Sequence, residues 1–161
     1  MARRGIILAG GAGTRLYPAT KALSKQLLPI YDKPMIYYPI QTLVDAGIKD
    51  ILLVTGGRNS GDFLRLLANG KEFGLAHLNY TYQEGEGGIA DALSLAEHFA
   101  DGDKICVILG DNIIEKSIAD AVRDSNQLDA AERLSLVTPN DFERWVRPDR
   151  MVRPGDTLAN T

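Results

Sequence analysis

A glycine-rich segment that ends in an arginine follows the first apolar run of the chain. Residues 5–8 read Gly-Ile-Ile-Leu, and residues 9–16 continue Ala-Gly-Gly-Ala-Gly-Thr-Arg-Leu. Glycines after a strand let backbone N–H groups approach an anion with no Cβ in the way. The Arg15 guanidinium adds a planar fork of donors suited to phosphate. The segment predicts a phosphate-binding loop, and the alternative is a tight strand-to-helix turn with an exposed arginine.

The spacing of this segment excludes two common phosphate motifs. The dinucleotide fingerprint needs a further glycine three residues after Gly13, where Leu16 stands instead. The P-loop ends in Gly-Lys-Ser/Thr, and no such triplet occurs here. A phosphate loop at this position is therefore of another kind.

Two further polar residues follow later apolar runs. Asp111 comes just after residues 105–109, and Gln83 ends the alternating run of residues 78–82. Mg²⁺ prefers one or two carboxylates together with phosphate oxygens, so Asp111 is a candidate metal ligand. An aspartate in a strand-end turn without function is the alternative. Gln83 carries a carbonyl and an amide in one plane, which can pair with the imide edge of thymine or uracil.

Combined with a second segment, the glycine loop resembles a known family. Residues 25–29 read Lys-Gln-Leu-Leu-Pro, and residues 33–39 read Lys-Pro-Met-Ile-Tyr-Tyr-Pro. Together with residues 10–16, these two segments resemble the pattern of the sugar-1-phosphate nucleotidyltransferases. Residues 33–39 match the thymidylyltransferase branch of that family in particular. The likeness continues through Tyr82-Gln83, residues 88–92 and residues 107–112, and it covers roughly residues 3–122.

The resemblance implies a reaction and its substrates. A phosphate oxygen of a sugar-1-phosphate attacks the α-phosphorus of a nucleoside triphosphate, and pyrophosphate leaves. The implied substrates are dTTP or UTP and glucose-1-phosphate, the implied cofactor is Mg²⁺, and full-length relatives are expected to form homo-oligomers. The nucleophile is already an anion, so positioning and electrostatics are expected to supply the catalysis.

The resemblance also assigns roles to individual residues. The expected catalytic residues are Arg15, which stabilises the α-phosphate and the leaving pyrophosphate, Lys25, which holds phosphate, and Asp111, which binds the metal. Gly88 is expected to present its backbone to the base, although the glycines around it could equally form only a flexible turn. The nucleotide-binding residues are expected to be Leu8, Ala9, Gly10, Gly11, Gly13, Thr14, Arg15, Gln83 and Gly88, and the substrate-binding residues Lys25, Gln26, Gly110 and Asn112.

The pattern of the chain predicts alternating strands and helices. Apolar runs predict strands, and apolar residues at helical spacing predict helices. The expected result is a Rossmann-like, doubly wound, mostly parallel α/β sheet, with ligands at the carboxyl ends of its strands. The expected strands are 4–9, 51–54, 78–83 and 105–109, and the expected helices are 34–46, 63–70 and 88–99.

The C-terminal part departs from the family pattern. We expect a nucleotide-binding core over residues 1–122 and a divergent tail over 123–161, in which residues 134–137 could form the next strand. The family's sugar-binding segment and second metal-binding aspartate are not recognisable there, which suggests a truncated or frame-shifted product with a loosely packed tail. A nucleotide-binding remnant or regulatory subunit without turnover is therefore the alternative to an active enzyme.

Composition restricts the function further. The formal net charge of −3 gives no basic footprint for nucleic acid. No apolar run is long enough for a membrane span. Glycines break the apolar stretch after Arg3-Arg4, which argues against a signal peptide. The single cysteine cannot form an internal disulfide, which fits a reducing compartment. We expect a cytoplasmic protein with Cys106 as a buried structural thiol. His77 and His98 have no partners at zinc-ligand spacing.

Overall fold

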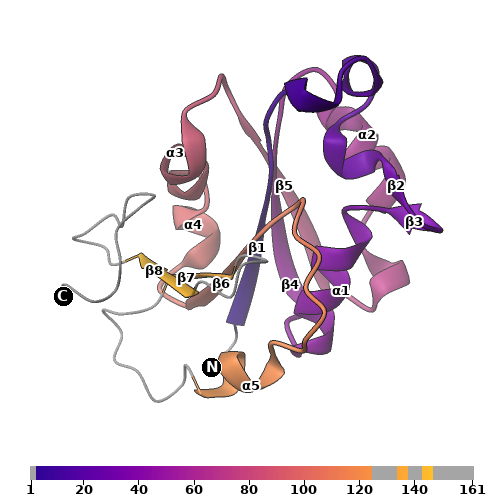
Figure 1. The fold of residues 1–161 in the computed structure, drawn as a ribbon. Coiled ribbons are helices and arrows are strands. Elements are labelled where there is room, and N and C mark those ends of the chain that lie inside the picture. Colours follow the sequence, from indigo (N-terminus) through magenta and orange to yellow (C-terminus); the bar gives the residue numbers. More distant parts are fainter. Residues whose placement is uncertain (1–2, 125–133, 138–142, 147–161) are drawn as a thin grey trace.

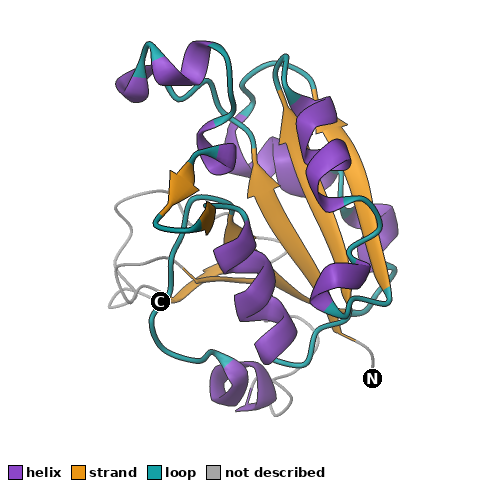
Figure 2. Ribbon diagram, turned by 90° about the vertical axis from the view of Figure 1, so that its right-hand side faces the viewer, coloured by secondary structure: helices purple, strands orange, loops and turns teal. Residues whose placement is uncertain are grey.

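A central, mostly parallel sheet organises the computed structural model, which describes residues 3–124, 134–137 and 143–146. The strand order in this part of the chain is β5-β4-β1-β6-β7-β8, and only β8 runs antiparallel to its neighbour (Figures 1 and 2). The strands are β1 (Arg3–Ala9), β4 (Asp50–Gly56), β5 (His77–Gln83), β6 (Lys104–Leu109), β7 (Leu134–Val137) and β8 (Glu143–Val146).

Helices cover both faces of the sheet, as Figure 1 shows. The core on one face joins α1 and α2 to the residues before and within α5, and the core on the other face packs α3 and α4 against the strands. The helices are α1 (Tyr37–Asp45), α2 (Ser60–Leu67), α3 (Gly88–Ser94), α4 (Glu97–Ala100) and α5 (Ala119–Asp124). The prediction of a doubly wound α/β fold is confirmed.

The strand β1 lies in the middle of the sheet because its side chains are apolar on both faces. Ile7 belongs to the core with α1, and Ile6 to the core with α3; neither side chain is exposed. Strands buried on both faces read as continuous apolar runs, which is why the sequence identified this one. β1 pairs in parallel with β4 on one side and with β6 on the other, so the loops after all three strands lie at one edge.

All three helix predictions were wrong in their bounds. The helix expected over 63–70 is α2, which spans Ser60–Leu67. The helix expected from residue 34 begins at Tyr37, because Lys33–Pro34 forms the strand β3 and pairs with β2 (Pro29–Ile30) in a short hairpin. The helix expected over 88–99 is divided into α3 and α4. Its chain tightens where the Ala96 N–H donates to the Leu93 carbonyl, three residues back, instead of four.

The sheet continues into the segment that the sequence treated as divergent. The strand expected at residues 134–137 is present as β7, parallel to β6, and β8 then pairs with β7. The rest of the expected tail lies outside the described residues, and so does the prediction that it is loosely packed. The sheet is therefore extended on the β6 side by two strands that follow residue 122.

Candidate active site

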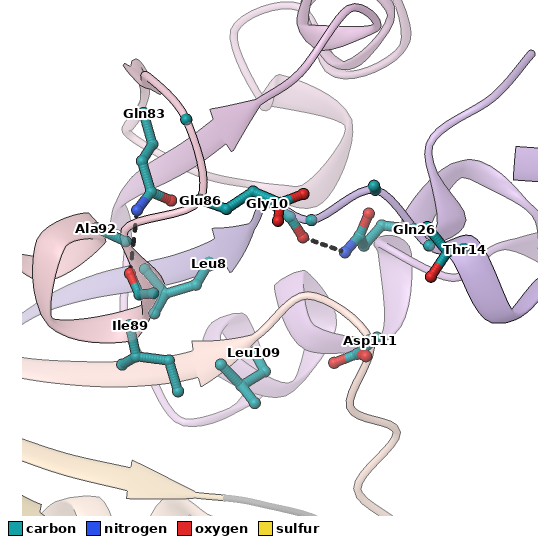
Figure 3. Close-up of a pocket in the computed structure, with 15 residues that line it drawn as sticks. Leu8, Gly10, Thr14, Gln26, Gln83, Glu86, Ile89, Ala92, Leu109 and Asp111 are labelled. Atoms are coloured by element: carbon teal, nitrogen blue, oxygen red, sulfur yellow. Dashed lines mark hydrogen bonds between the residues drawn. The ribbon is translucent and has the colours of Figure 1, made fainter. Parts of the chain in front are cut away.

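Two adjoining cavities lie at the carboxyl ends of β1, β5 and β6. The larger has a volume of about 500 Å³ and lies between the glycine loop and the start of α3 (Figure 3). The smaller has a volume of about 350 Å³ and extends along the loop past Arg15 and Lys25. They share Gly10, Gly11, Gly13, Thr14, Gln26 and Asp111, so together they form one continuous site.

The glycine loop lines both cavities and takes backbone angles that favour glycine. Gly11 has φ 103° and Gly13 has φ 61°, in the left-handed region that L side chains rarely adopt. The Gly13 carbonyl accepts a hydrogen bond from the Thr20 hydroxyl at 2.6 Å, and this contact fixes the end of the loop. A short 3₁₀ turn over Thr14–Leu16 then carries Arg15 to the wall of the smaller cavity.

Lys25 and Asp111 face each other across the site. The Lys25 Nζ donates to Asp111 Oδ2 at 2.8 Å, although the two residues are far apart in the sequence. Lys25 stands on a 3₁₀ turn after the glycine loop, and Asp111 follows β6. About a third of each side chain is exposed, so both groups can reach a ligand in the cavity. The expected phosphate-binding lysine and the expected metal ligand are therefore direct neighbours.

Gln26 is buried beneath the glycine loop. Its Nε2 donates to the Gly10 carbonyl at 3.3 Å, and its own backbone carbonyl accepts from the Ile36 N–H at 2.8 Å. Gln26 is 4% exposed, and its Oε1 has no hydrogen-bond partner in the part of the chain that the structure describes. A buried oxygen without a partner costs free energy unless a ligand or water supplies a donor. The substrate contact expected for Gln26 stays a prediction.

The amide group of Gln83 is held in one orientation. Nε2 donates to the Gly88 carbonyl at 3.0 Å and to Asp91 Oδ2 at 2.8 Å. Oε1 faces the loop instead, since a Cβ placed on Gly10 would lie 3.4 Å from it. The sequence led us to expect that both halves of this amide would read a base, but in the structure the nitrogen is already engaged within the protein.

Three expected site residues lie behind the cavity walls. Ala9 is 2% exposed and belongs to the core, and Asn112 is 4% exposed. Gly110 touches the end of β1, where its N–H donates to the Leu8 carbonyl at 2.8 Å. A Cβ there would lie 3.1 Å from that carbonyl oxygen and 3.2 Å from Gln26 Cγ. In the structure Gly110 thus supports the site by allowing close packing.

The structure adds residues that the sequence did not single out. Leu109, Ile89 and Ala92 join the expected nucleotide-binding residue Leu8 in the apolar floor of the larger cavity, and Glu86 contributes a carboxylate to its wall (Figure 3). Leu109 is the last apolar side chain on this face of β6, as Leu8 is on β1. Its position just before Asp111 is a signal that could have found Leu109.

The oxygen ligands that the site offers to Mg²⁺ come from Asp111. Asp111 supplies one carboxylate that opens into both cavities, and Mg²⁺ commonly takes one or two carboxylates together with phosphate oxygens and waters. Among the described residues, no group of three or more His, Cys, Asp or Glu side chains is arranged to hold a metal ion. The single carboxylate fits a magnesium ion only where a ligand would supply the remaining oxygen atoms.

Features outside the site have structural roles. Cys106 is buried in β6, and this burial raises the pKa of its thiol to about 12, although the Arg3 charge acts in the opposite direction. His77 contacts Asp50, with Nδ1 and Oδ1 2.5 Å apart. None of the described helices has the length and apolar character of a membrane span.

Comparison with known proteins defines the family. The profile of the nucleotidyl transferase family matches residues 4–144, so the chain belongs to this family, and the match passes the point near residue 122 where the sequence resemblance was expected to stop. The chain is 53% identical to the glucose-1-phosphate thymidylyltransferase of Neisseria meningitidis over 110 residues, and these residues make up 68% of this chain and 38% of that protein. It is 43% identical to the Xanthomonas campestris enzyme of the same name over 144 residues, and these residues make up 89% of this chain and 48% of that protein.

Solved structures share the fold. A Bacillus anthracis protein named for the same activity superposes with a TM-score of 0.76 at 45% identity, over 78% of this chain and 51% of that one. A UDP-glucose pyrophosphorylase crystallised with UDP-glucose has a TM-score of 0.65 at 23% identity, which shows the common fold. The chain spans less than half the length of the two curated relatives described above.

Proposed function

We propose that this chain joins dTTP, or UTP, to glucose-1-phosphate and releases pyrophosphate. The observation that carries the proposal is the convergence of four separate segments on one site: the glycine loop, Lys25, Gln83 and Asp111. The glycine loop and Lys25 bring N–H and ammonium donors suited to phosphate. Gln83 brings an amide that can pair with a base, and Asp111 brings a carboxylate. The names of the curated relatives support the same activity.

The triphosphate is proposed to lie along the glycine loop. The loop amides and Arg15 line the smaller cavity, where they would neutralise charge on the α-phosphate and on the pyrophosphate as it leaves. Lys25 would hold the phosphates of the two substrates close together, since its ammonium group reaches the same cavity. Because the attacking oxygen is already ionised, the protein contributes orientation and charge stabilisation, and no general base is needed.

Asp111 is the residue proposed to hold Mg²⁺. Its carboxylate is paired with Lys25, so the lysine would have to turn toward phosphate as the metal approaches. When bound, the ion would supply further neutralisation of the triphosphate charge. Gln26 lies beside this pair and would offer its unpartnered Oε1 to a substrate hydroxyl or N–H group.

Pyrophosphate release tests this proposal directly. The chain would be incubated with glucose-1-phosphate, Mg²⁺ and each of dTTP, UTP, ATP and CTP, with binding measured in parallel by calorimetry. We expect release with dTTP or UTP and much less with ATP or CTP, because a site that hydrogen-bonds its ligand rejects analogues that leave buried groups unpaired. Failure of all four nucleotides to bind would refute the proposal.

One outcome would favour a different function. Binding of dTTP or UTP without pyrophosphate release would support a nucleotide-binding protein without turnover, which is the alternative that the sequence left open. The nucleotide half of the proposal would then stand, and the transfer half would be wrong.

A further inference from the structure

We propose that Asp91, which lies outside the cavity, determines which base the site accepts by fixing the orientation of the Gln83 amide. The inference rests on the proposed function, since it assumes that Gln83 contacts the base. Asp91 is on the exposed side of α3, and its Oδ2 accepts a hydrogen bond from Gln83 Nε2 at 2.8 Å. Gln83 itself is 8% exposed, so this contact anchors a nearly buried side chain.

The partners of Gln83 define which end of the amide faces inward. The terminal atom between Gly88 and Asp91 meets a carbonyl oxygen at 3.0 Å and a carboxylate oxygen at 2.8 Å. An ionised carboxylate and a carbonyl only accept hydrogen bonds, so this atom must be the NH₂ group, whose two hydrogens are both used. The group left for a ligand is Oε1, an acceptor, on the side of Gly10.

An acceptor in this position distinguishes the pyrimidines. Thymine and uracil carry an N–H at ring position 3, which can donate to Oε1, whereas cytosine has an unprotonated nitrogen there. Cytosine would require the amide to rotate, and rotation would place Oε1 against the Asp91 carboxylate and the Gly88 carbonyl. Three acceptors would then face one another in a nearly buried place, which is costly. Asp91 therefore lowers the affinity of the site for cytosine by fixing the orientation of Gln83, which makes it a positioning residue.

Gly87 provides a second, independent observation. Its φ of −71° suits any residue, so the backbone does not require glycine. A Cβ at this position would lie 2.5 Å from Asp91 Oδ2 and 2.6 Å from its Cγ. The absence of a side chain at residue 87 is thus what allows the carboxylate to lie back across the start of α3 and reach Gln83.

The test compares the ratio of dissociation constants for dCTP and dTTP in five proteins: the wild type, two single variants at residues 91 and 87, their double variant and a control. Asp91→Asn keeps the shape of the side chain but adds a donor, so the Gln83 amide can rotate. Gly87→Ala displaces the carboxylate without changing its chemistry. Asp45→Asn is the matched control, because the exposed Asp45 accepts a 2.7 Å hydrogen bond from Gln41 on α1, away from both cavities. Inorganic tripolyphosphate serves as a probe of the phosphate site alone.

We expect the wild-type preference for dTTP to fall about tenfold in Asp91→Asn and in Gly87→Ala, the equivalent of one hydrogen bond to a charged group. The double variant should lose no more than Asp91→Asn alone, since both changes act on one contact. Tripolyphosphate affinity and the Asp45→Asn ratio should stay unchanged. A purely structural role for Asp91 would weaken dTTP and dCTP alike and leave their ratio intact.

The outcomes separate this inference from the proposed function. A wild-type protein that prefers dTTP and variants that keep this preference would overturn the role of Asp91 and leave the proposed function standing. A wild-type protein that binds dTTP and dCTP equally, or neither, would overturn base reading by Gln83 and the Asp91 inference with it. Should Asp91→Asn fail to fold, Gly87→Ala decides the matter on its own.

Discussion

At the scale of single residues, the site depends on charges that the fold brings together from distant segments. Lys25 and Asp111 form an ion pair, while Arg15 lines the same cavity on an exposed turn. Each of these side chains keeps access to solvent, which lets it exchange its present contacts for those with a ligand. Two further polar residues of the site, Gln26 and Gln83, are nearly buried, and the side-chain amide of each donates to a backbone carbonyl.

Removing the Arg15 charge should weaken the triphosphate site. We expect Arg15→Ala to reduce dTTP affinity by about tenfold or more, since a charge-assisted hydrogen bond to phosphate is lost, and to reduce turnover where turnover occurs. The thermal midpoint should not change, because Arg15 is exposed and contributes no side chain to the core. Calorimetry and a thermal melt would measure the two quantities.

Arg65→Ala is the control for the loss of one positive charge. Arg65 is on α2, is 80% exposed, pairs with Asp62 and lines neither cavity. Equal loss of dTTP affinity in both variants would mean that Arg15 acts only through the net charge of the protein, and unchanged affinity in Arg15→Ala would exclude it from the site.

Individual residues also show where sequence reasoning stopped. The glycine loop, Lys25 and Asp111 could be found because their types and order along the chain carry the family pattern. The orientation of the Gln83 amide could not, because it depends on Asp91, one turn into a helix whose start the sequence treated as a possible flexible turn. The burial of Asn112 could not be found either, because a polar residue after a strand reads as exposed.

At the scale of elements, the contact between β1 and α1 leaves no room for a side chain at Gly5. A Cβ there would lie 2.8 Å from Leu43 Cδ1 and 3.2 Å from both Ile48 Cγ2 and Ile51 Cγ1. All three neighbours are fully or almost fully buried, so none can move into solvent. Gly5 therefore sets the distance at which α1 packs on the sheet.

Alanine substitutions at two glycines should change stability in opposite directions. Gly5→Ala should lower the free energy of unfolding by about 1–3 kcal/mol through overpacking. Gly61→Ala should raise it by about 0.5–1 kcal/mol, because Gly61 lies in α2 with no atom within 4 Å of an added Cβ. Urea unfolding of both variants would measure the difference. A stabilising Gly5→Ala would show that α1 can shift away from β1 at no cost.

Elements were predicted well where one periodicity dominated. The strands at residues 4–9, 51–54 and 105–109 were found because buried strands read as continuous apolar runs. The strand at residues 78–83 was found because its apolar and polar residues alternate. The strand expected at residues 134–137 is also present. The start of α1 was missed because Pro34 suits a first helical turn as well as a hairpin, and the pairing of Pro29 with Pro34 depends on partners that the local pattern does not contain. The division between α3 and α4 was missed because the apolar face continues through the break.

At the scale of the whole molecule, the two cores on opposite faces of the sheet determine stability, and Cys106 belongs to one of them. Burial raises the pKa of its thiol from 9.0 to about 12. The thiol therefore stays protonated in the folded protein above pH 9, where the unfolded chain begins to lose this proton. Since the folded state then binds more protons than the unfolded state, stability must fall as pH rises through this range.

This linkage gives a measurable pH dependence. Between pH 9 and pH 10 the Cys106 thiol should remove about 1 kcal/mol from the free energy of unfolding. Cys106→Ala should lack this loss. The comparison should not go above pH 10, because burial also raises the pKa of Tyr80, from 10.0 to about 12. Urea titrations of both proteins at pH 8, 9 and 10 would test it. Identical slopes against pH would show that the thiol ionises equally in both states.

The strand order was expected only in general terms from the sequence. Alternating strands and helices predicted a doubly wound sheet, but the order β5-β4-β1-β6-β7-β8 depends on which strands meet across the sheet, and that is decided by long-range packing. The place of the site was more predictable than the strand order, because the glycine loop, the loop after Gln83 and Asp111 directly follow strands, and parallel strands end at one edge.

The place of β1 in the sheet has a consequence for biosynthesis. β1 begins at Arg3, yet one of its two neighbours, β6, begins at Lys104. At a ribosomal rate of about 5–20 residues per second, roughly 5–20 s separate the emergence of these strands. Throughout that interval the backbone N–H and C=O groups of β1 that will pair with β6 have no partner strand, and an unpaired edge is a template for aggregation. We therefore expect the nascent chain to recruit a holding chaperone to its first strand until β6 has left the ribosome.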